Sequence, residues 1–206
     1  MKTHFAAFAA LALAATVAVL AGVAAVKQQA VALVRDGELP MPADDKAWSK
    51  FLSAIQRPDA KQVREIYMNP NAKGGSAAAG FPDGTVFVME NYAARALPDG
   101  TLELGADGKL VKGDLLRVFV MGKNAGWGQE VAEPLKNGNW IYASYLASGQ
   151  KGPENLGACR ACHAPLTQGK DFVHRYDEHF SQRGTSITRA AIVGAKRRAQ
   201  GGEAAL

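Results

Sequence analysis

Cysteine is scarce in this chain of 206 residues, which holds only two, Cys159 and Cys162. The scarcity excludes a framework of several disulfides and a zinc site built from two cysteine pairs. A bridge between Cys159 and Cys162 would close a very small loop and would constrain the unfolded chain little. A structural disulfide is therefore a poor explanation of the pair.

The N-terminal residues 1–26 lack charge after Lys2, and Phe5 to Val26 is an uninterrupted run of apolar or small residues. Small residues near Ala25 offer a cleavage site, so the segment is typical of a signal peptide. The run is also long enough to be an uncleaved membrane anchor through residues 5–26. Both alternatives place the folded part outside the cytoplasm, and we expect a periplasmic protein.

Basic residues exceed acidic ones, giving a net charge of +5, and part of the excess lies in the C-terminal tail, residues 183–206. The tail groups Lys196, Arg197 and Arg198 but contains no aromatic residue. Nucleic-acid-binding tails commonly interleave the two kinds of side chain, and an exported protein meets little nucleic acid. We therefore expect a solvated tail and no nucleic-acid partner.

The first third of the chain has a helical pattern after a linker at residues 27–44. In residues 43–56, Asp44 and Asp45 can cap a helix, which Pro58 would end. The apolar face of this helix would consist of Trp48, Phe51, Leu52 and Ile55. Residues 59–68 resemble a second short helix, followed by a turn-rich segment.

The middle of the chain is rich in β-branched and aromatic residues. Strands are predicted at Thr85 to Tyr92, after a Pro-Asp-Gly turn, and at residues 115–123 and 139–146. Close spacing without intervening helices indicates an antiparallel sheet. After Gly157 the pattern is helical again, around the cysteines and at residues 170–182. The sequence predicts one α+β domain at 45–182, an antiparallel β-sheet packed with helices.

His163 follows Cys162 directly, and three chemistries use such a cysteine pair. A thioredoxin-type redox pair belongs in an early βαβ unit, which this late position does not offer. A structural zinc ion needs four ligands, and only His174 and His179 are near enough in sequence to complete the set. Covalent haem attachment needs two thiols for the vinyl groups and an adjacent histidine for the iron. Haem c fits best, with Cys159 and Cys162 as tethers and His163 as the metal ligand.

No methionine follows Cys162, although small electron-carrying cytochromes c supply their axial methionine downstream of the motif. A sixth ligand would have to be His174, His179 or one of the upstream residues Met41, Met68, Met89 and Met121. Methionines on apolar strands are more often core residues than ligands. An unfilled sixth position would make the protein a gas binder or a catalyst instead of an electron carrier.

The segments "REIYMNPNA", "FPDGTVFVMENY", "RVFVMGK", "NWIYASY" and "CRACHAPLTQGKDFV" occur in this order. Together they resemble the cytochrome P-460 superfamily, which includes lysine-crosslinked hydroxylamine oxidisers and the cytochromes c′-beta. The resemblance covers about residues 45 to 180. It implies a mostly antiparallel sheet packed with helices, a homodimer, and one five-coordinate haem with His163 as proximal ligand.

In the hydroxylamine oxidisers a lysine on the first strong strand is bonded to the haem ring, and a distal carboxylate relays protons. At the matching position this chain has Met89, and alternation sends Glu90 to the opposite face. If Met89 faces the haem, Phe87 and Asn91 share its face. The neighbouring strand would add Phe119 and Met121. We also consider Arg64 and Tyr67 as side chains that reach the pocket or a haem propionate.

These observations predict a periplasmic mono-haem c-type cytochrome of the cytochrome c′-beta kind, which binds nitric oxide or similar small nitrogen-oxide ligands at an open iron. The predicted cofactor-binding residues are Cys159, Cys162, His163, Met89, Phe87 and Arg64. The alternatives are a cytochrome P-460 enzyme that oxidises hydroxylamine and a six-coordinate electron-transfer cytochrome. The predicted partners are the small ligand, an electron-transfer protein and a second copy of the chain.

Overall fold

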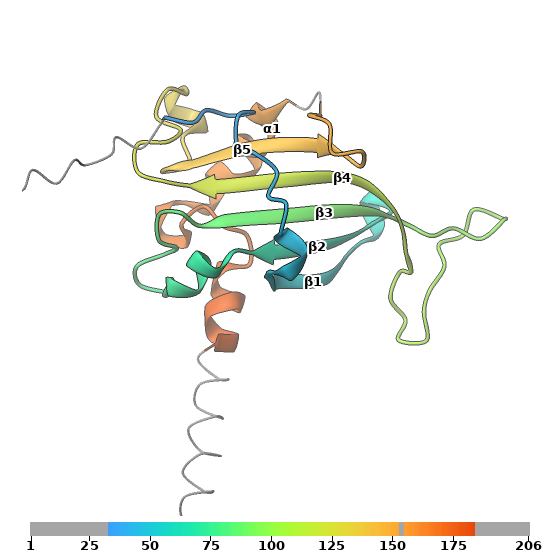
Figure 1. Ribbon diagram of the computed structural model, residues 1–206. Helices are drawn as coiled ribbons and strands as arrows, with labels where there is room; N and C mark the ends of the chain where they lie inside the picture. Colours follow the sequence, from blue (N-terminus) through green and yellow to red (C-terminus); the bar gives the residue numbers. More distant parts are fainter. Residues whose placement is uncertain (1–32, 153–154, 184–206) are drawn as a thin grey trace, which may run out of the picture. The chain divides into compact units, whose positions relative to one another are not determined.

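An antiparallel sheet is the frame of the computed structural model, which describes residues 33–152 and 155–183. In these ranges five strands follow one another across the sheet in chain order (Figure 1). They are β1 (Ser49–Arg57), β2 (Gln62–Met68), β3 (Val86–Ala94), β4 (Lys112–Lys123) and β5 (Trp140–Leu146). Each strand is hydrogen-bonded to the next in antiparallel register, so no crossover helix is needed between them.

The helical segments are short. Helix α1 (Leu156–His163) follows the sheet, and residues 176–183 are also helical. The 3-10 turns are η1 (Asp45–Ala47), η2 (Pro58–Ala60), η3 (Pro70–Gly74), η4 (Glu133–Leu135), η5 (Ala164–Leu166) and η6 (Gln168–Lys170). Sheet and helices together confirm the predicted α+β class.

Both ends of the chain fall outside the described ranges. The predicted signal peptide or anchor, residues 1–26, lies outside them, as does the predicted tail after its first residue. Within the described ranges, no helix has the length and apolar character that crossing a bilayer requires.

The three strands predicted from the middle of the sequence are confirmed as β3, β4 and β5. The Pro-Asp-Gly turn before β3 is also present. Gly84 has a φ of 80°, in the region that favours glycine, and the Thr85 hydroxyl donates a hydrogen bond to the Pro82 carbonyl at 2.7 Å. The turn therefore fixes where β3 begins.

The two helices predicted for residues 43–56 and 59–68 are wrong, because these residues mainly form β1 and β2. The register between β1 and β2 shifts on both sides of Leu52, and Ala54 has a φ of 50°. Such bulges break the two-residue alternation by which a strand is identified, so the apolar spacing resembles a helix face. In β2, pairing with strands on both sides outweighs the helical pattern.

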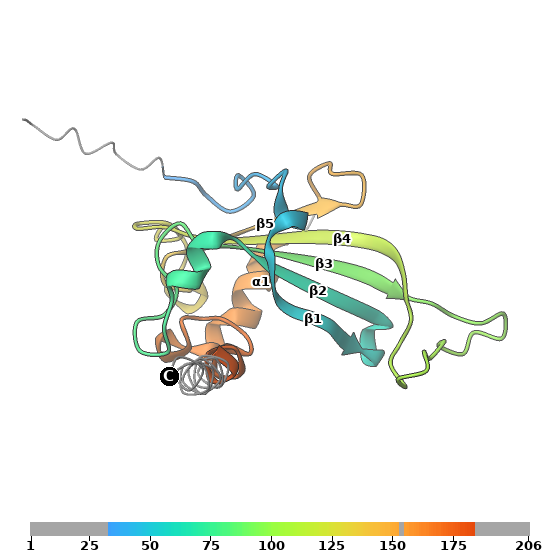
Figure 2. The ribbon, with the colours of Figure 1, turned by 60° about the horizontal axis from the view of Figure 1, so that its bottom comes forward.

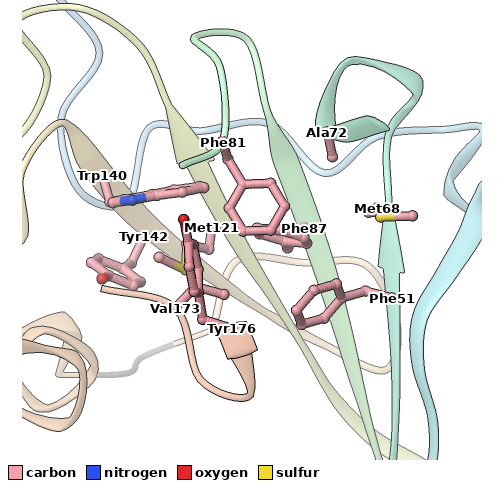
Figure 3. Close-up of a cluster of buried hydrophobic side chains, with 10 residues drawn as sticks. All are labelled: Phe51, Met68, Ala72, Phe81, Phe87, Met121, Trp140, Tyr142, Val173 and Tyr176. Atoms are coloured by element: carbon pink, nitrogen blue, oxygen red, sulfur yellow. The ribbon is translucent and has the colours of Figure 1, made fainter. Parts of the chain in front are cut away.

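Each face of the sheet carries its own apolar core. One face packs against the C-terminal part of the chain (Figure 3). Its buried residues are Phe51, Met68, Ala72, Phe81, Phe87, Met121, Trp140, Tyr142, Val173 and Tyr176. The other core consists of Leu39, Tyr67, Val88, Val118, Val120, Trp127, Ile141, Ala143 and Tyr145. The N-terminal and C-terminal segments thus lie on opposite faces of the sheet (Figure 2).

Residues 33–44, the described part of the predicted linker, pack onto the sheet. Leu39 is buried in the second core, and its carbonyl accepts a hydrogen bond from the Tyr145 hydroxyl at 2.6 Å. Gly37 donates its N–H to the Tyr142 carbonyl at 2.7 Å. We call residues 33–44 the N-terminal strap.

His179 is a buried titratable group beside the first core. Its ring lies 4.6 Å from the ring centre of Phe51, and its Nε2 atom is buried without a hydrogen-bond partner. Burial, with a smaller effect of the Arg183 guanidinium, lowers the pKa of His179 from 6.5 to about 4. The folded protein therefore keeps this imidazole neutral.

The buried imidazole predicts acid sensitivity. The unfolded chain binds a proton at His179 below about pH 6.5 and the folded chain only near pH 4, so stability is lost as the pH falls through this window. Between pH 7 and pH 5 the wild type should lose about 2 kcal/mol more than His179→Phe. Urea unfolding of both proteins at the two pH values measures the difference. Equal losses would contradict the assignment.

Candidate functional site

Helix α1 brings the three motif side chains together. The Asn155 side chain caps its start by accepting a hydrogen bond from the Gly157 N–H at 3.0 Å. Cys159 lies three and four residues before Cys162 and His163, so the three side chains share one side of the helix. Both cysteines are free thiols.

A cavity of about 520 Å³ lies against these side chains, within the size range of cofactor sites. Its lining comes from the sheet, from α1 and from the segment that follows α1. The apolar residues of the sheet in the lining include Phe51, Leu52, Ile55, Ile66, Phe87, Met89, Phe119 and Met121. Cys159, Cys162, His163, Val173 and His174 line it from the C-terminal part.

The floor of the cavity follows the alternation of β3. Phe87, Met89 and Asn91 line the cavity, whereas Glu90 lies on the other face and pairs with Lys46. Phe119 lies opposite Met89 in the register with β4. The face that the sequence predicts for these side chains is therefore the face on which they lie.

A polar edge interrupts the apolar floor. Arg64 and Asn91 are direct partners across β2 and β3, and both line the cavity. The Nε atom of Arg64 and the Oδ1 atom of Asn91 are buried without hydrogen-bond partners. Tyr67, which we considered beside Arg64, is in the other core, because it lies three positions after Arg64 and an odd offset along a strand points a side chain to the opposite face.

The His163 ring has a defined orientation. Its Nδ1 atom lies 2.7 Å from the Phe172 carbonyl, which can only accept a hydrogen bond, so Nδ1 carries the proton and Nε2 keeps its lone pair. Burial lowers the pKa of His163 from 6.5 to about 4, partly offset by the Phe172 carbonyl. The imidazole is thus neutral at pH 7 and ready to bind a metal ion.

The other two chemistries find little support in the described residues. Within them, no group of three or more His, Cys, Asp and Glu side chains can hold a metal ion, although His174 Nε2 lies 3.6 Å from Cys162 Sγ. Burial raises the pKa of Cys159, whereas redox-active cysteines have lowered values. The sheet is antiparallel throughout, so the motif does not follow a βαβ unit.

Of the two histidines considered as sixth ligands, the structure brings only His174 to the cavity. His174 lies edge-on to His163, with ring centres 4.9 Å apart. His179 is buried among the aromatic rings of the first core and does not belong to the described lining.

Arg160, inside the cysteine motif, is a supporting residue that sequence reasoning missed. Only 1% of it is exposed, and its guanidinium donates to both carboxylate oxygens of Asp36, at 2.5 and 3.0 Å. It also donates to the Trp140 carbonyl at 3.2 Å. The pair ties α1 to the N-terminal strap across 124 residues of sequence, and no local pattern reveals such a partner.

The fold and the site define a cofactor-binding protein with a haem-attachment motif in the wall of an apolar cavity. The family model of cytochrome P460 matches residues 42–175, and the chain belongs to this family. Family membership implies that the protein binds haem. Comparison with curated proteins finds no match.

The residues present fit a haem group. Two free thiols and a neutral imidazole line the same largely apolar cavity, which suits a flat apolar macrocycle. Of the two unpartnered buried atoms at the polar edge, Arg64 Nε is a donor that needs an acceptor in the cavity, and Asn91 Oδ1 is an acceptor that needs a donor. Haem supplies an apolar ring for the cavity and charged propionates that can accept the Arg64 Nε–H.

The buried ion pair behind α1 predicts a large loss of stability on removal of its charge. Asp36→Asn leaves the Arg160 guanidinium buried without a counter-ion, and the free energy of unfolding should fall by about 3 kcal/mol. Urea denaturation measures this change. The control is Glu133→Gln, which breaks the exposed pair with Lys136 and should cost less than about 0.5 kcal/mol. Similar losses in the two variants would show that Arg160 does not depend on Asp36.

Proposed function

We propose that the protein is a mono-haem c-type cytochrome with an open distal position, at which it binds nitric oxide or a similar small nitrogen-oxide ligand. The observation that carries the proposal is the composition of the cavity. The attachment motif lies in its wall, and Met89 and Phe87 lie on the β3 part of its floor. The resemblance to the hydroxylamine oxidisers implies that those enzymes have a haem-bonded lysine at the position of Met89.

Cys159 and Cys162 are the proposed tethers, one thioether each. Their position on one side of a capped helix presents both thiols to the same edge of a flat group. Burial keeps Cys159 protonated, which protects the thiol from oxidation before attachment.

His163 is the proposed proximal ligand. The Phe172 carbonyl holds the proton on Nδ1, directs Nε2 to the metal and increases the donor strength of the ring. When bound, the haem supplies an iron with a vacant axial position, at which a diatomic ligand can be held.

The opposite wall selects the ligand. Met89, Phe87, Phe119 and Met121 offer no charge and no strong hydrogen-bond donor. Within the described lining there is no lysine and no carboxylate that could serve as crosslink or proton relay. Such a wall favours a small uncharged ligand over hydroxylamine chemistry.

Arg64 is the proposed partner of a haem propionate, because its unpartnered Nε–H can donate to a carboxylate. Of the three arginines that line the cavity, Arg57 is paired with Asp59 and Arg175 with Glu178. Among the residues that the structure describes, Arg64 hydrogen-bonds only the neutral Gln62 side chain, at 3.3 Å, so its charge is available to a carboxylate.

The setting of the protein is part of the proposal. Residues 1–26 support export to the periplasm, where haem c is attached, with residues 5–26 as the alternative membrane anchor. A homodimer and an electron-transfer partner that reduces the iron follow from the resemblance to the superfamily.

Ligand binding by protein matured with haem tests the proposal. Stoichiometric binding of nitric oxide to the ferrous protein, together with no turnover of hydroxylamine in the presence of an electron acceptor, is the expected result. Steady hydroxylamine oxidation would replace gas binding with the enzyme activity. Failure to bind any diatomic ligand would favour the electron carrier.

Variants of the tethers and of the proximal ligand should lose different properties of the bound haem. Replacing both cysteines by serine should abolish haem that survives denaturing electrophoresis, because no thioether can form. His163→Ala should keep the covalent haem and lose the native axial ligation, seen as a changed absorption spectrum. Covalent haem in the double cysteine variant would contradict the assigned tethers.

Met89→Leu tests the distal wall. Because leucine and methionine have similar volumes, stability should change by less than about 1.5 kcal/mol and covalent haem should be retained. The rate constant for nitric oxide binding should change by no more than about tenfold, equivalent to 1.4 kcal/mol. Met41→Leu, outside the cavity lining, is the control and should change nothing. A hundredfold faster rate would mean that Met89 itself occupies the iron, and loss of haem would refute its placement.

A further inference from the structure

We propose that Lys123 and Asp171 are positioning residues for the proximal histidine: their ion pair fixes the backbone carbonyl of Phe172, which in turn sets the orientation and donor strength of His163. This inference rests on the proposed function, in which His163 binds iron. Neither residue belongs to the described lining of the haem cavity.

Asp171 is held from three parts of the fold. Both of its carboxylate oxygens lie 2.9 Å from Lys123 Nζ at the end of β4, and one accepts the Phe81 N–H at 2.8 Å. Its backbone carbonyl accepts a hydrogen bond from Trp140 Nε1, at the start of β5, at 2.9 Å. The residue is therefore fixed to the sheet through both its side chain and its backbone.

The backbone at this point needs such support. Asp171 and Phe172 have φ angles of 47° and 54°, in the left-handed region that residues other than glycine rarely adopt. Consecutive residues in this region are unfavourable and persist only where the surroundings hold them. Replacing Asp171 or Lys123 removes the principal side-chain contacts that hold this conformation.

Two glycines allow neighbouring segments to approach Asp171 and Phe172 closely. A Cβ atom on Gly80 would lie 2.8 Å from the Asp171 carboxylate, and one on Gly138 would lie 3.2 Å from the Phe172 ring. Both glycines also have positive φ angles, of 75° and 60°. Asp171 and Phe172 are thus each packed closely against a glycine.

The carbonyl that this turn presents is the one that His163 uses. Phe172 directly follows Asp171, and its carbonyl lies 2.7 Å from His163 Nδ1. Hydrogen bonds to the second nitrogen of a ligating histidine set the ring orientation and raise its basicity. A change in the backbone conformation of Phe172 therefore reaches His163, and through it the iron, by a single hydrogen bond.

The ion pair is well shielded, since the side chains of Lys123 and Asp171 are only 15% and 13% exposed. Lys123 also donates to the Phe81 carbonyl at 2.7 Å, so the same ammonium group holds two segments. An exposed pair on the same segment, Lys170 with Asp177, has side chains that are 46% and 73% exposed. It provides a matched control.

The experiment compares Lys123→Met, Asp171→Asn and the control Lys170→Met in the haem-loaded protein. The readouts are the iron–histidine stretching frequency of the ferrous form, by resonance Raman spectroscopy, and the midpoint potential. A weaker hydrogen bond to Nδ1 makes His163 a poorer donor, so both ion-pair variants should lower the frequency. Their ferrous-to-ferric ratio at a fixed potential should rise about tenfold, or 59 mV for one electron. Lys170→Met should match the wild type in both.

Unchanged frequency and potential in the two ion-pair variants, even with lower melting temperatures, would overturn the proposal and leave a purely structural role. If Lys123→Met does not fold, Lys123→Gln replaces it, because glutamine keeps a hydrogen-bond donor while removing the charge. The frequency and the potential should then shift in the same directions, by smaller amounts. Absence of the iron–histidine band in the wild type would refute the ligation of His163, and with it the proposed function, before any variant is compared.

Discussion

The two-residue alternation of the strands is the constraint on which the rest of this structure depends. Along β3 it sends Phe87, Met89 and Asn91 to the cavity and Val88 and Glu90 to the opposite side. The sheet can therefore serve two purposes, because one face packs tightly against the N-terminal strap while the other leaves room for a cofactor. A shift of one residue in the register would exchange the two faces and place a carboxylate in the apolar cavity.

A site that must keep space for a cofactor has to be supported from outside. Here the support is ionic. Asp36 and Arg160 hold helix α1 to the strap, and Lys123 and Asp171 hold the segment after it to the sheet. Shielded ion pairs of this kind are sensitive to the loss of one partner, and their geometry restricts the conformations that the segment can adopt. The motif side chains are thereby fixed in the wall of the cavity.

The sequence predicts the chemistry of the site better than its supports. The spacing of Cys159, Cys162 and His163 predicts haem attachment, and the structure brings the three side chains to one cavity, while the face of Met89 follows from alternation in a regular strand. The strand β1 was missed because bulges near Leu52 and Ala54 hide the alternation, and β2 because pairing with strands on both sides outweighs its helical pattern. Asp36 and Asp171 could not be recognised as supports from the sequence. Their partners are distant in the chain, and a sequence does not distinguish an ordinary surface aspartate from one that holds a shielded ion pair. The family relationship, which spans residues 42–175, agrees with the haem chemistry inferred from the motif.

The absorption spectrum of the ferrous protein, matured with haem, tests the central claim most directly. We predict an ordinary high-spin c-type spectrum, because two thioethers and one imidazole leave the sixth position open. A broad, strongly red-shifted Soret band would contradict it by revealing a further bond to the ring. Sharp low-spin bands would contradict it in another way, because they would show that a side chain such as that of Met89 fills the sixth position.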